Sequence, residues 1–443
     1  MAKPGSRHHR VLIVGGGAAG LTVAHLLLRL QPQLDLALLE PSADHYYQPG
    51  WTLVGGGLCS LEQTRRDQAS LIPKGCLWIQ AAATEFKPAQ NQLLISTGET
   101  LSYDVLIIAT GLRCRWEQIK GLPQALGSHG ICSNYSPQYA SYSWETIRNF
   151  QGGTAIFTVP ETAIKCGGAP QKVMYMADDH FKAKSGVGVN TEVLFCTAGS
   201  TMFAVPAYGR VMAQLALRRG IKLLLRHKLI EVLAEQQLAV FAVSDQAGNV
   251  SRKEFGFDML HVVPPMTAPD VVANSPLASA EAGGWVDVDK FSTQHRRYAN
   301  VFALGDVASL PTAKTAGSAR AAAPVTAANV LAFLGGQPLL AQYDGYSVCP
   351  IISGYGRVVM AEFDYSKQPV SSFLVDPTKE RWSMWLLKTR LLPWLYWQRM
   401  LKGLPHEGRY LKPLAPLVHW LRLDYRANPQ DLEPQAETSE GCS

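Results

Sequence analysis

The sequence predicts an α/β fold with two dinucleotide-binding domains of the Rossmann type, followed by an amphipathic helical region at the C-terminus. Three observations predict it. A glycine turn joins an apolar strand to a helix near the N-terminus. Of two later apolar strands, the first runs into a turn and the second ends in an acidic residue. Residues 381–422 mix basic and aromatic side chains. At 443 residues the chain is longer than one hydrophobic core supports, so we expect more than one domain.

The N-terminal segment has the pattern of a strand, a glycine turn, a helix and a second strand. These are Val11–Val14, Gly15-x-Gly17-x-x-Gly20 with Ala18 and Ala19 inside it, Leu21–Leu30 and Leu34–Leu39. Glycines allow a tight turn and close approach of a pyrophosphate, and the helix N-terminus attracts phosphate. Glu40 follows about 20 residues after the turn, where an acid accepts hydrogen bonds from ribose hydroxyls. We therefore expect the turn residues and Glu40 to bind a dinucleotide.

Two later segments indicate which dinucleotide. Tyr103–Gly111 (YDVLIIATG) reads as a strand running into a turn, and Asn300–Asp306 (NVFALGD) as a strand that ends in an acid. Together with the glycine turn they resemble the glutathione-reductase-like flavoproteins that have two dinucleotide-binding domains. The resemblance implies that Asp306 binds FAD, although the same position would also suit a helix N-cap. A helix over Ala316–Leu334, kinked at Pro324, would direct its N-terminus at the flavin.

The second domain lacks the signature of a nicotinamide site. The strand Thr154–Thr158 runs into Val-Pro-Glu-Thr with no second G-x-G-x-x-G, so we expect an electron donor other than NAD(P)H. Cys166 follows in KCGGAPQK, where two flanking lysines and small neighbours predict a reactive thiol of lowered pKa. An ordinary buried cysteine remains the alternative for Cys166. A second cysteine, Cys349 in VCPIISGY, is expected on local grounds to be a small core residue.

Several segments closely resemble the sulfide:quinone oxidoreductase family, in the branch that includes the mitochondrial enzyme. They are HYYQPGWTLVGGG from His45, KCGGAPQK from Lys165, MLHVVPPMTAPDVV from Met259, GWVDVDKFSTQHRRYANVFALGD from Gly284, YDGYSVCPIISGY from Tyr343 and AEFDY from Ala361. The resemblance implies that Cys166 and Cys349 are a redox pair beside non-covalently bound FAD. It also implies a set of FAD contacts outside the glycine turn: Gln48, Ala83, Lys314, Thr315, Ala316 and Gly317.

The resemblance further implies an enzyme and its mechanism. Hydrosulfide attacks the Cys166–Cys349 disulfide, or its trisulfide form, leaving a persulfide on Cys349 and a thiolate on Cys166 that Lys165 or Lys172 stabilises. Two electrons pass to FAD and then to a quinone, and the persulfide sulfur leaves to a small acceptor such as sulfite, glutathione or coenzyme A. Another branch has a third cysteine about thirty residues before the pair. We expect Cys132 to be a non-essential thiol instead.

The C-terminal region is expected to bind a membrane surface. Between Arg381 and Arg422 there are eight basic residues, one acid and five of the ten tryptophans. Residues 382–404 read as two amphipathic helices broken at Pro393, with more of the same over 411–423. By the resemblance, this region holds quinone and membrane residues: Lys388, Trp394, Tyr396 and Trp397. A helical hairpin packed on its own domain or at a dimer interface is the alternative. No apolar run reaches the ~18 residues of a spanning helix.

These observations give a provisional organisation. We expect an FAD-binding domain over 1–150, a second Rossmann-like domain over 151–283, a return to the first over 284–372 and the membrane region over 373–443.

No transit peptide is evident, so we expect a monotopic protein on the cytoplasmic face of a bacterial inner membrane, with the mitochondrial inner membrane as the alternative. Dispersed histidines predict no metal, and nothing predicts nucleic acid; a homo-oligomer remains open. Rival functions are a type-II NADH:quinone reductase and a sulfide sensor without turnover.

Overall fold

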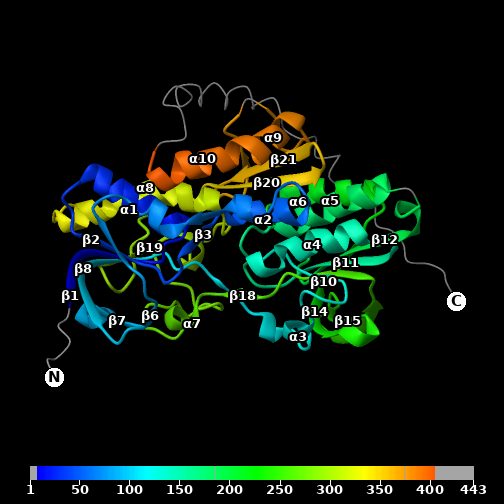
Figure 1. The fold of residues 1–443 in the computed structure, drawn as a ribbon, viewed down its shortest axis with the longest axis horizontal. Coiled ribbons are helices and arrows are strands. Elements are labelled where there is room, and N and C mark those ends of the chain that lie inside the picture. The colour runs from blue at the N-terminus through cyan, green and yellow to red at the C-terminus, as the bar shows by residue number, and fades with distance from the viewer. Residues whose placement is uncertain (1–6, 185, 374, 405–443) are drawn as a thin grey trace. The chain divides into compact units, whose positions relative to one another are not determined.

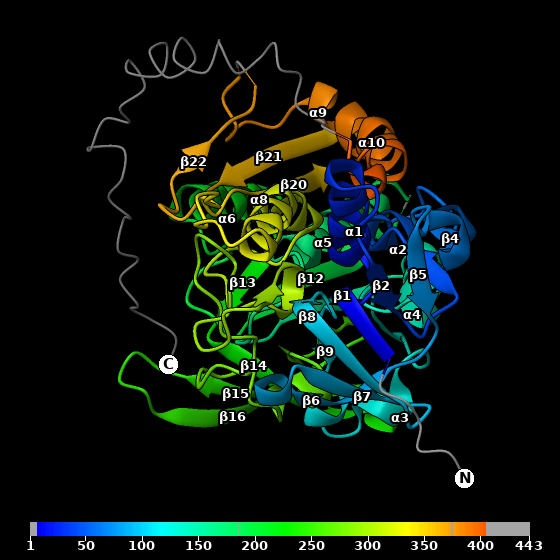
Figure 2. The ribbon, with the colours of Figure 1, turned by 90° about the vertical axis from the view of Figure 1, so that its left-hand side faces the viewer.

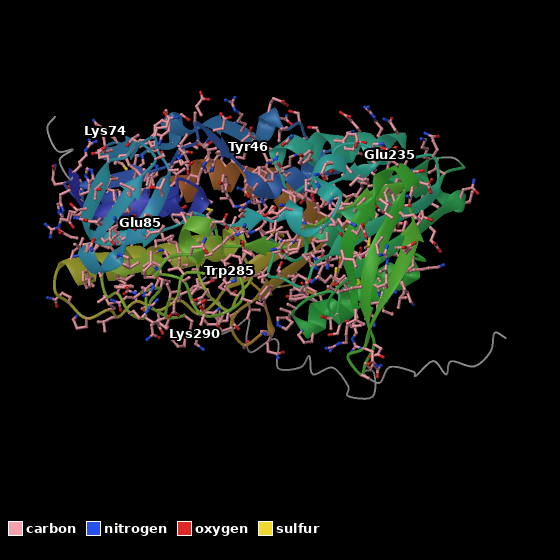
Figure 3. The ribbon with its side chains drawn as sticks, turned by 90° about the horizontal axis from the view of Figure 1, so that it is seen from below. Tyr46, Lys74, Glu85, Glu235, Trp285 and Lys290 are labelled. Atoms are coloured by element: carbon pink, nitrogen blue, oxygen red, sulfur yellow. The ribbon has the colours of Figure 1, made fainter. Side chains whose placement is uncertain are left out.

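The computed structural model describes residues 7–184, 186–373 and 375–404, and these confirm the predicted α/β class. Two mainly parallel sheets lie apart, and an antiparallel hairpin with the last two helices covers one side of both (Figure 1). In Figure 3, Glu85 in the first sheet and Glu235 beyond the second lie at opposite ends of the view. Most of the predicted segment 373–443 lies outside the described residues.

The first sheet has the strand order β5-β2-β1-β8-β7-β6, with β19 beside β8. Its strands are β1 (Arg7–Val14), β2 (Leu36–Leu39), β5 (Cys76–Ile79), β6 (Ala83–Lys87), β7 (Gln92–Ile95), β8 (Thr100–Ile108) and β19 (Val301–Ala303). The central strands run parallel and have apolar side chains on both faces, as a sheet covered by helices requires. The helices α1 (Ala18–Leu30) and α8 (Ala316–Leu334) pack against each other beside it.

The glycine turn joins β1 to α1 because larger side chains do not fit there. Gly15 has φ +106°, and a Cβ on it would lie 2.4 Å from the Ala109 carbonyl oxygen at the end of β8. A Cβ on Gly20 would lie 1.9 Å from the Gly15 carbonyl oxygen, so this glycine lets α1 approach the strand. The predicted strand and helix are both present, and each begins a few residues earlier than expected.

The second sheet is parallel throughout, in the order β10-β17-β11-β12-β13. Its strands are β10 (Ile131–Cys132), β11 (Gly153–Val159), β12 (Thr191–Thr197), β13 (Lys222–Leu225) and β17 (Met259–His261). The helices that pack on it are α4 (Pro137–Asn149), α5 (Ala169–Ala183) and α6 (Pro206–Arg218). An antiparallel sheet of β14 (His227–Leu233), β15 (Leu238–Ser244) and β16 (Val250–Gly256) adjoins it.

A second antiparallel sheet connects the two halves. It consists of β20 (Ser347–Gly354), β21 (Arg357–Phe363) and β22 (Pro369–Val370). Strand β20 packs on α5 and α8, and Ile351, Val359 and Phe363 join the core of the second sheet. Burial of these apolar side chains therefore brings β20 against the start of α5.

The remaining elements are short. They are α2 (Trp51–Gly55), α3 (Leu122–Ala125), α7 (Asp270–Ala273), β3 (Asp44–Tyr46), β4 (Arg65–Asp67), β9 (Arg113–Cys114) and β18 (Met266–Thr267). The described chain ends in α9 (Trp382–Leu386), a π-helical turn (Leu387–Leu391) and α10 (Leu392–Gln398). The turn after α10, Met400–Lys402, packs against α1, and Figure 2 shows α10 near α1.

Candidate functional site

Two cysteines 183 positions apart in the sequence meet at the junction of α5 and β20. The Cys166 Sγ and Cys349 Sγ atoms lie 3.3 Å apart. This distance exceeds an S–S bond of about 2.05 Å and corresponds to a hydrogen bond between a thiol and a thiolate. Cys349 lies on β20 and is 1% exposed, whereas Cys166 lies in the loop between β11 and α5. The structure thus places the two predicted cysteines together.

Local backbone geometry holds the Cys166 sulfur in place. Cys166 has φ +54°, a left-handed conformation that is uncommon outside glycine and is often found at functional sites. Its N–H donates to the Lys314 carbonyl at 2.7 Å, which ties the loop to the segment before α8. Gly168 completes the approach, because a Cβ there would lie 2.5 Å from Cys349 Sγ. The contact between the sulfurs therefore requires glycine at position 168.

The two sulfurs differ in charge. The hydrogen bond from Cys349 lowers the pKa of Cys166 well below its usual value, and the Lys172 ammonium, with Nζ at 3.1 Å, lowers this pKa further, although burial opposes both effects. The same hydrogen bond, together with burial, raises the pKa of Cys349. Cys166 is thus the thiolate and Cys349 the thiol.

Only one of the two flanking lysines contacts the thiolate. Lys172, on the first turns of α5, reaches back to Cys166, while Lys165 donates to Gln48 Oε1 at 2.9 Å and lies 4.6 Å from the centre of a ring of Trp51. The expectation that either lysine could stabilise the thiolate is therefore narrowed to Lys172. The Gln48 side chain thus accepts its hydrogen bond from Lys165 and not from the two cysteines.

The glycine turn forms an open polar ledge. Both Glu40 carboxylate oxygens accept backbone hydrogen bonds, from Gly16 N–H at 2.7 Å and Ser42 N–H at 2.8 Å, so Glu40 also holds the turn itself. A Cβ on Gly17 would meet no described atom within 4 Å, and Thr110 Oγ1 is buried with no hydrogen-bond partner in the described part of the chain. Open backbone, an unpaired hydroxyl and the α1 N-terminus fit the pyrophosphate of a dinucleotide such as FAD.

The segment before α8 forms the other side of this site. Asp306 lies in a 3₁₀ turn, and α8 is capped by Thr315, whose Oγ1 accepts from Ser318 N–H at 3.1 Å. Thr315, and not Asp306, is therefore the N-cap residue of α8. Lys314 Nζ donates to the Asp306 carbonyl at 2.6 Å and lies 3.6 Å from the ring centre of Trp285, which Figure 3 labels.

Charge and shape near Asp306 also favour a polar ligand. Burial raises the pKa of Asp306 and lowers that of Lys314 to about 8, because each charge has lost solvent. The Asp306 carboxylate has no hydrogen-bond or ion-pair partner among the residues that the structure describes. A small cavity opens beside it, lined by residues between Gly305 and Ser318.

Five other residues that were predicted to contact FAD lie at defined positions in the helices and strands. A Cβ on Gly317 would lie 2.4 Å from Val348 Cγ1, so this glycine lets α8 pack on β20. Ala83 begins β6 and pairs with Ile95. Ala18 and Ala19 form the first turn of α1, and Ala316 is the first residue of α8.

Comparisons with known proteins agree with this arrangement. Residues 9–141 match the model of the pyridine nucleotide-disulphide oxidoreductases. The mitochondrial sulfide:quinone oxidoreductase of Mus musculus is 41% identical over 93% of this chain and 90% of its own, and that of Dictyostelium discoideum is 42% identical over 89% and 86%. The chain belongs to the sulfide:quinone oxidoreductase family. The structure of the sulfide:quinone oxidoreductase from Aquifex aeolicus has the same fold, with TM-score 0.74, 17% identity and 96% coverage of both chains.

In this member of the family the C-terminal helical run continues through Pro393, whereas a break there was predicted. The run from α9 through the π turn to α10 is continuous, and Pro393 lies in the first turn of α10. A proline has no N–H to donate and its ring clashes with the preceding turn. The wider π turn over Leu387–Leu391 accommodates it without ending the helix. The predicted continuation over 411–423 lies outside the described residues.

The four predicted quinone and membrane residues do not share one face. Lys388 is 2% and Tyr396 4% exposed, so both face the protein interior, and Trp397 packs edge-on against His45 with Arg66 over its ring. Only Trp394, 54% exposed, faces solvent. Tyr396 thus packs inward, and its hydroxyl has a buried partner.

That partner, His45, was missed at the sequence level. Its Nε2 lies 2.6 Å from Tyr396 Oη, and its Nδ1 lies 3.2 Å from the Gly16 carbonyl oxygen. Burial lowers the pKa of His45 to about 4, so the ring is neutral at pH 7. One imidazole thus connects α10 to the glycine turn. The only sequence signal was the aromatic run His45-Tyr46-Tyr47 shortly after the second strand.

The remaining described cysteines have raised pKa values. Cys132 is fully buried on β10, and burial raises its pKa to about 12. Its non-essential role stays a prediction. Burial also raises the pKa of the other described thiols: Cys59, Cys76, Cys114 and Cys196. Cys442 lies outside the described residues. Within 7–184, 186–373 and 375–404 no metal-ligand cluster is found, and no helix has the length and apolar character needed to cross a bilayer.

Proposed function

We propose that this chain is an FAD-dependent enzyme that oxidises hydrosulfide and passes two electrons to a quinone. The observation that carries the proposal is the contact between the Cys166 thiolate, with Lys172 beside it, and the Cys349 thiol. Relatives at 41–42% identity carry the name sulfide:quinone oxidoreductase. A thiolate and a thiol within bonding reach can cycle between dithiol and disulfide, which is the chemistry that hydrosulfide requires.

The charges assign a role to each sulfur. In the oxidised pair, hydrosulfide attacks Cys349 Sγ and forms a new S–S bond, the Cys166–Cys349 bond breaks, and Cys166 keeps the electron pair as a thiolate. Because Lys172 stabilises this thiolate, Cys166 is the better leaving group and the persulfide forms on Cys349. Two electrons are released when Cys166 Sγ forms an S–S bond again, either to the persulfide sulfur or, after that sulfur has left, to Cys349 Sγ, and bound FAD would supply the acceptor for them. The ledge at Gly17, with Asp306 and Lys314 opposite, would hold it.

Where a nicotinamide would bind, this chain has Cys166. Nine residues separate the end of β11 at Val159 from the start of α5 at Ala169, and they contain no glycine fingerprint. A dinucleotide turn would lead directly from strand to helix. This geometry disfavours the type-II NADH:quinone reductase. Strands from both 7–108 and 301–303 build the first sheet, which supports the proposed return of the chain to the first domain. The proposed boundary at residue 150 is too late, because β10 and α4 belong with the second sheet.

Membrane association is a further part of the proposal. Four large apolar side chains on the run from α9 to α10 are exposed: Trp382, Leu386, Leu391 and Trp394. Such a group on one short helical run suits the interface of a bilayer, where a quinone would enter. The relatives named mitochondrial favour the mitochondrial inner membrane over the cytoplasmic face of a bacterial membrane.

The persulfide sulfur would leave to a small nucleophile such as sulfite, glutathione or coenzyme A.

An anaerobic sulfide titration tests the reaction. Wild-type protein should lose its oxidised-flavin absorbance with one equivalent of sulfide, whereas Cys166→Ala and Cys349→Ala should retain it. NADH should cause no bleaching, and a soluble quinone analogue should restore the absorbance, which a sensor without turnover would not allow. Bleaching of both alanine variants at the wild-type rate would refute the role of the pair.

Vesicle flotation tests the membrane contact. Trp382→Ser combined with Trp394→Ser should stop the protein from floating with anionic phospholipid vesicles. The matched control combines Leu217→Ser with Leu340→Ser, two exposed leucines outside the C-terminal run, and should float like wild type. Equal flotation of both double variants would contradict the proposed surface.

A further inference from the structure

A buried tyrosine hydroxyl, that of Tyr135, lies in the cluster that packs against Cys166. Tyr135 is 3% exposed, yet its Oη has no hydrogen-bond partner among the residues that the structure describes. Buried polar atoms are almost always hydrogen-bonded, so an unpaired one next to reacting groups points to a ligand. The backbone of Tyr135 is held three residues beyond β10, where its N–H donates to Ser133 Oγ at 3.3 Å.

The surroundings of this tyrosine are apolar, apart from sulfur. Tyr135 packs in a small buried cluster with Ile164, Ala169, Val263 and Met266, and Cys166 packs against the same cluster. Burial and then the nearby cysteine charges raise the pKa of Tyr135 well above its usual value. The hydroxyl therefore keeps its proton and can donate a hydrogen bond to an anionic atom or a lone pair. Lys172, by contrast, is already in contact with Cys166.

We propose that the Tyr135 hydroxyl donates a hydrogen bond to the hydrosulfide sulfur as it attacks the Cys166–Cys349 pair. The inference rests on the proposed function and adds a substrate-binding residue to it. A small anion that enters an apolar pocket loses its water, and one fixed donor offsets part of that loss. Tyr135 transfers no proton: the sulfur forms its bond to Cys349, the Cys166–Cys349 bond breaks, and the electron pair stays on Cys166.

The chain provides a matched control for this test. Tyr103 is also a buried tyrosine, 2% exposed, with an unpaired Oη in the described part of the chain, but it lies on β8 opposite His9, in the other core. Replacing either tyrosine with phenylalanine removes one oxygen that has no hydrogen-bond partner among the residues described. Both variants should therefore fold and retain FAD, which far-UV circular dichroism and the flavin-to-protein absorbance ratio measure.

The kinetics should separate the two variants. Hydrogen bonds to charged groups are strong enough that Tyr135→Phe should lower kcat/KM for sulfide roughly 10- to 150-fold, at unchanged KM for the quinone. Tyr103→Phe should match wild type in both. The pH profile for alkylation of Cys166 should not change in Tyr135→Phe, because the hydroxyl does not bond that thiolate. Incorporation of 3-fluorotyrosine at position 135, which keeps the donor, should retain wild-type kcat/KM.

Four outcomes decide the matter. If sulfide does not bleach wild-type flavin, both the proposed function and this inference fall. If wild type is active and Tyr135→Phe has the same kcat/KM for sulfide, only the inference falls. Altered flavin absorbance in Tyr135→Phe, with unchanged sulfide kinetics, would assign the hydroxyl to the cofactor and overturn it. A loss in Tyr135→Phe that 3-fluorotyrosine does not show supports it, even if the phenylalanine variant proves less stable.

Discussion

Replacement of Lys388 by methionine should make the protein more stable. Lys388 lies in the π turn before α10, is 2% exposed, and its Nζ donates to the Pro49 carbonyl at 3.3 Å. Burial, and then the positive charge of Lys172, lower the pKa of Lys388 from 10.5 to about 8. Methionine has a similar length and no charge, so the variant avoids the cost of burying an ammonium group.

The size of this effect follows from proton linkage. The folded state binds the proton less tightly than the unfolded chain, so wild-type stability is lowest at acidic and neutral pH and recovers as pH rises from about 8 towards 10.5. At 1.36 kcal/mol for each tenfold change in proton affinity, the cost is about 3 kcal/mol at pH 7 and about 2 kcal/mol at pH 9. Lys388→Met should gain up to these amounts.

Urea unfolding followed by tryptophan fluorescence at pH 7 and pH 9 measures the gain as a shift of the midpoint. Lys402→Met, which removes an exposed lysine from the same C-terminal region, should not shift it at either pH. The reasoning is refuted if Lys388→Met is less stable than wild type at pH 7, or if its advantage grows with pH. We expect quinone reduction to weaken in this variant, since a stabilising change at a functional site often costs activity.

Three further changes test the site. Gly168→Ala should push Cys349 Sγ away from Cys166 and prevent disulfide formation, which counting thiols after mild oxidation measures. Gly167→Ala should not prevent it, because a Cβ at this position would meet no described atom within 4 Å. Lys172→Met should move the pH profile for alkylation of Cys166 to higher pH, whereas Lys165→Met should leave it nearly in place. Tyr396→Phe should cost about 1–3 kcal/mol, measured by thermal melting, because it leaves His45 Nε2 buried without its partner; an unchanged melting temperature would contradict that contact.

The glycine turn and Cys166 were visible in the sequence because their signals are local, whereas Cys349 was singled out only by the resemblance to the family. Gly15 and Gly20 are required by contacts with backbone a few residues away or at the adjacent strand end, and the helix over Ala316–Leu334 has the predicted bounds. The motif around Cys166 also predicted a lowered pKa from its neighbours along the chain, and Lys172 on the next helix provides the charge.

The C-terminal run was less predictable because the direction of a side chain depends on what it packs against. An aromatic residue such as Tyr396 suits a membrane interface and a protein core equally well, and its hydroxyl decides for the core only because His45 lies there. The continuous helix through Pro393 likewise depends on a π turn, which a sequence pattern does not specify.

The sequence by itself determined the chemistry that the chain carries: a turn shaped for a dinucleotide, a cysteine between two lysines in small-residue surroundings, a second cysteine far along the chain, and a basic, aromatic C-terminal run. The tertiary structure alone decided how these parts meet. Burial of apolar side chains on α5 and β20 brings the Cys166 and Cys349 sulfurs to 3.3 Å across 183 residues, places Lys172 and not Lys165 on the thiolate, and leaves the Tyr135 hydroxyl unpaired among the described residues beside them. Packing between distant segments fixes such contacts, and patterns along the chain do not encode them.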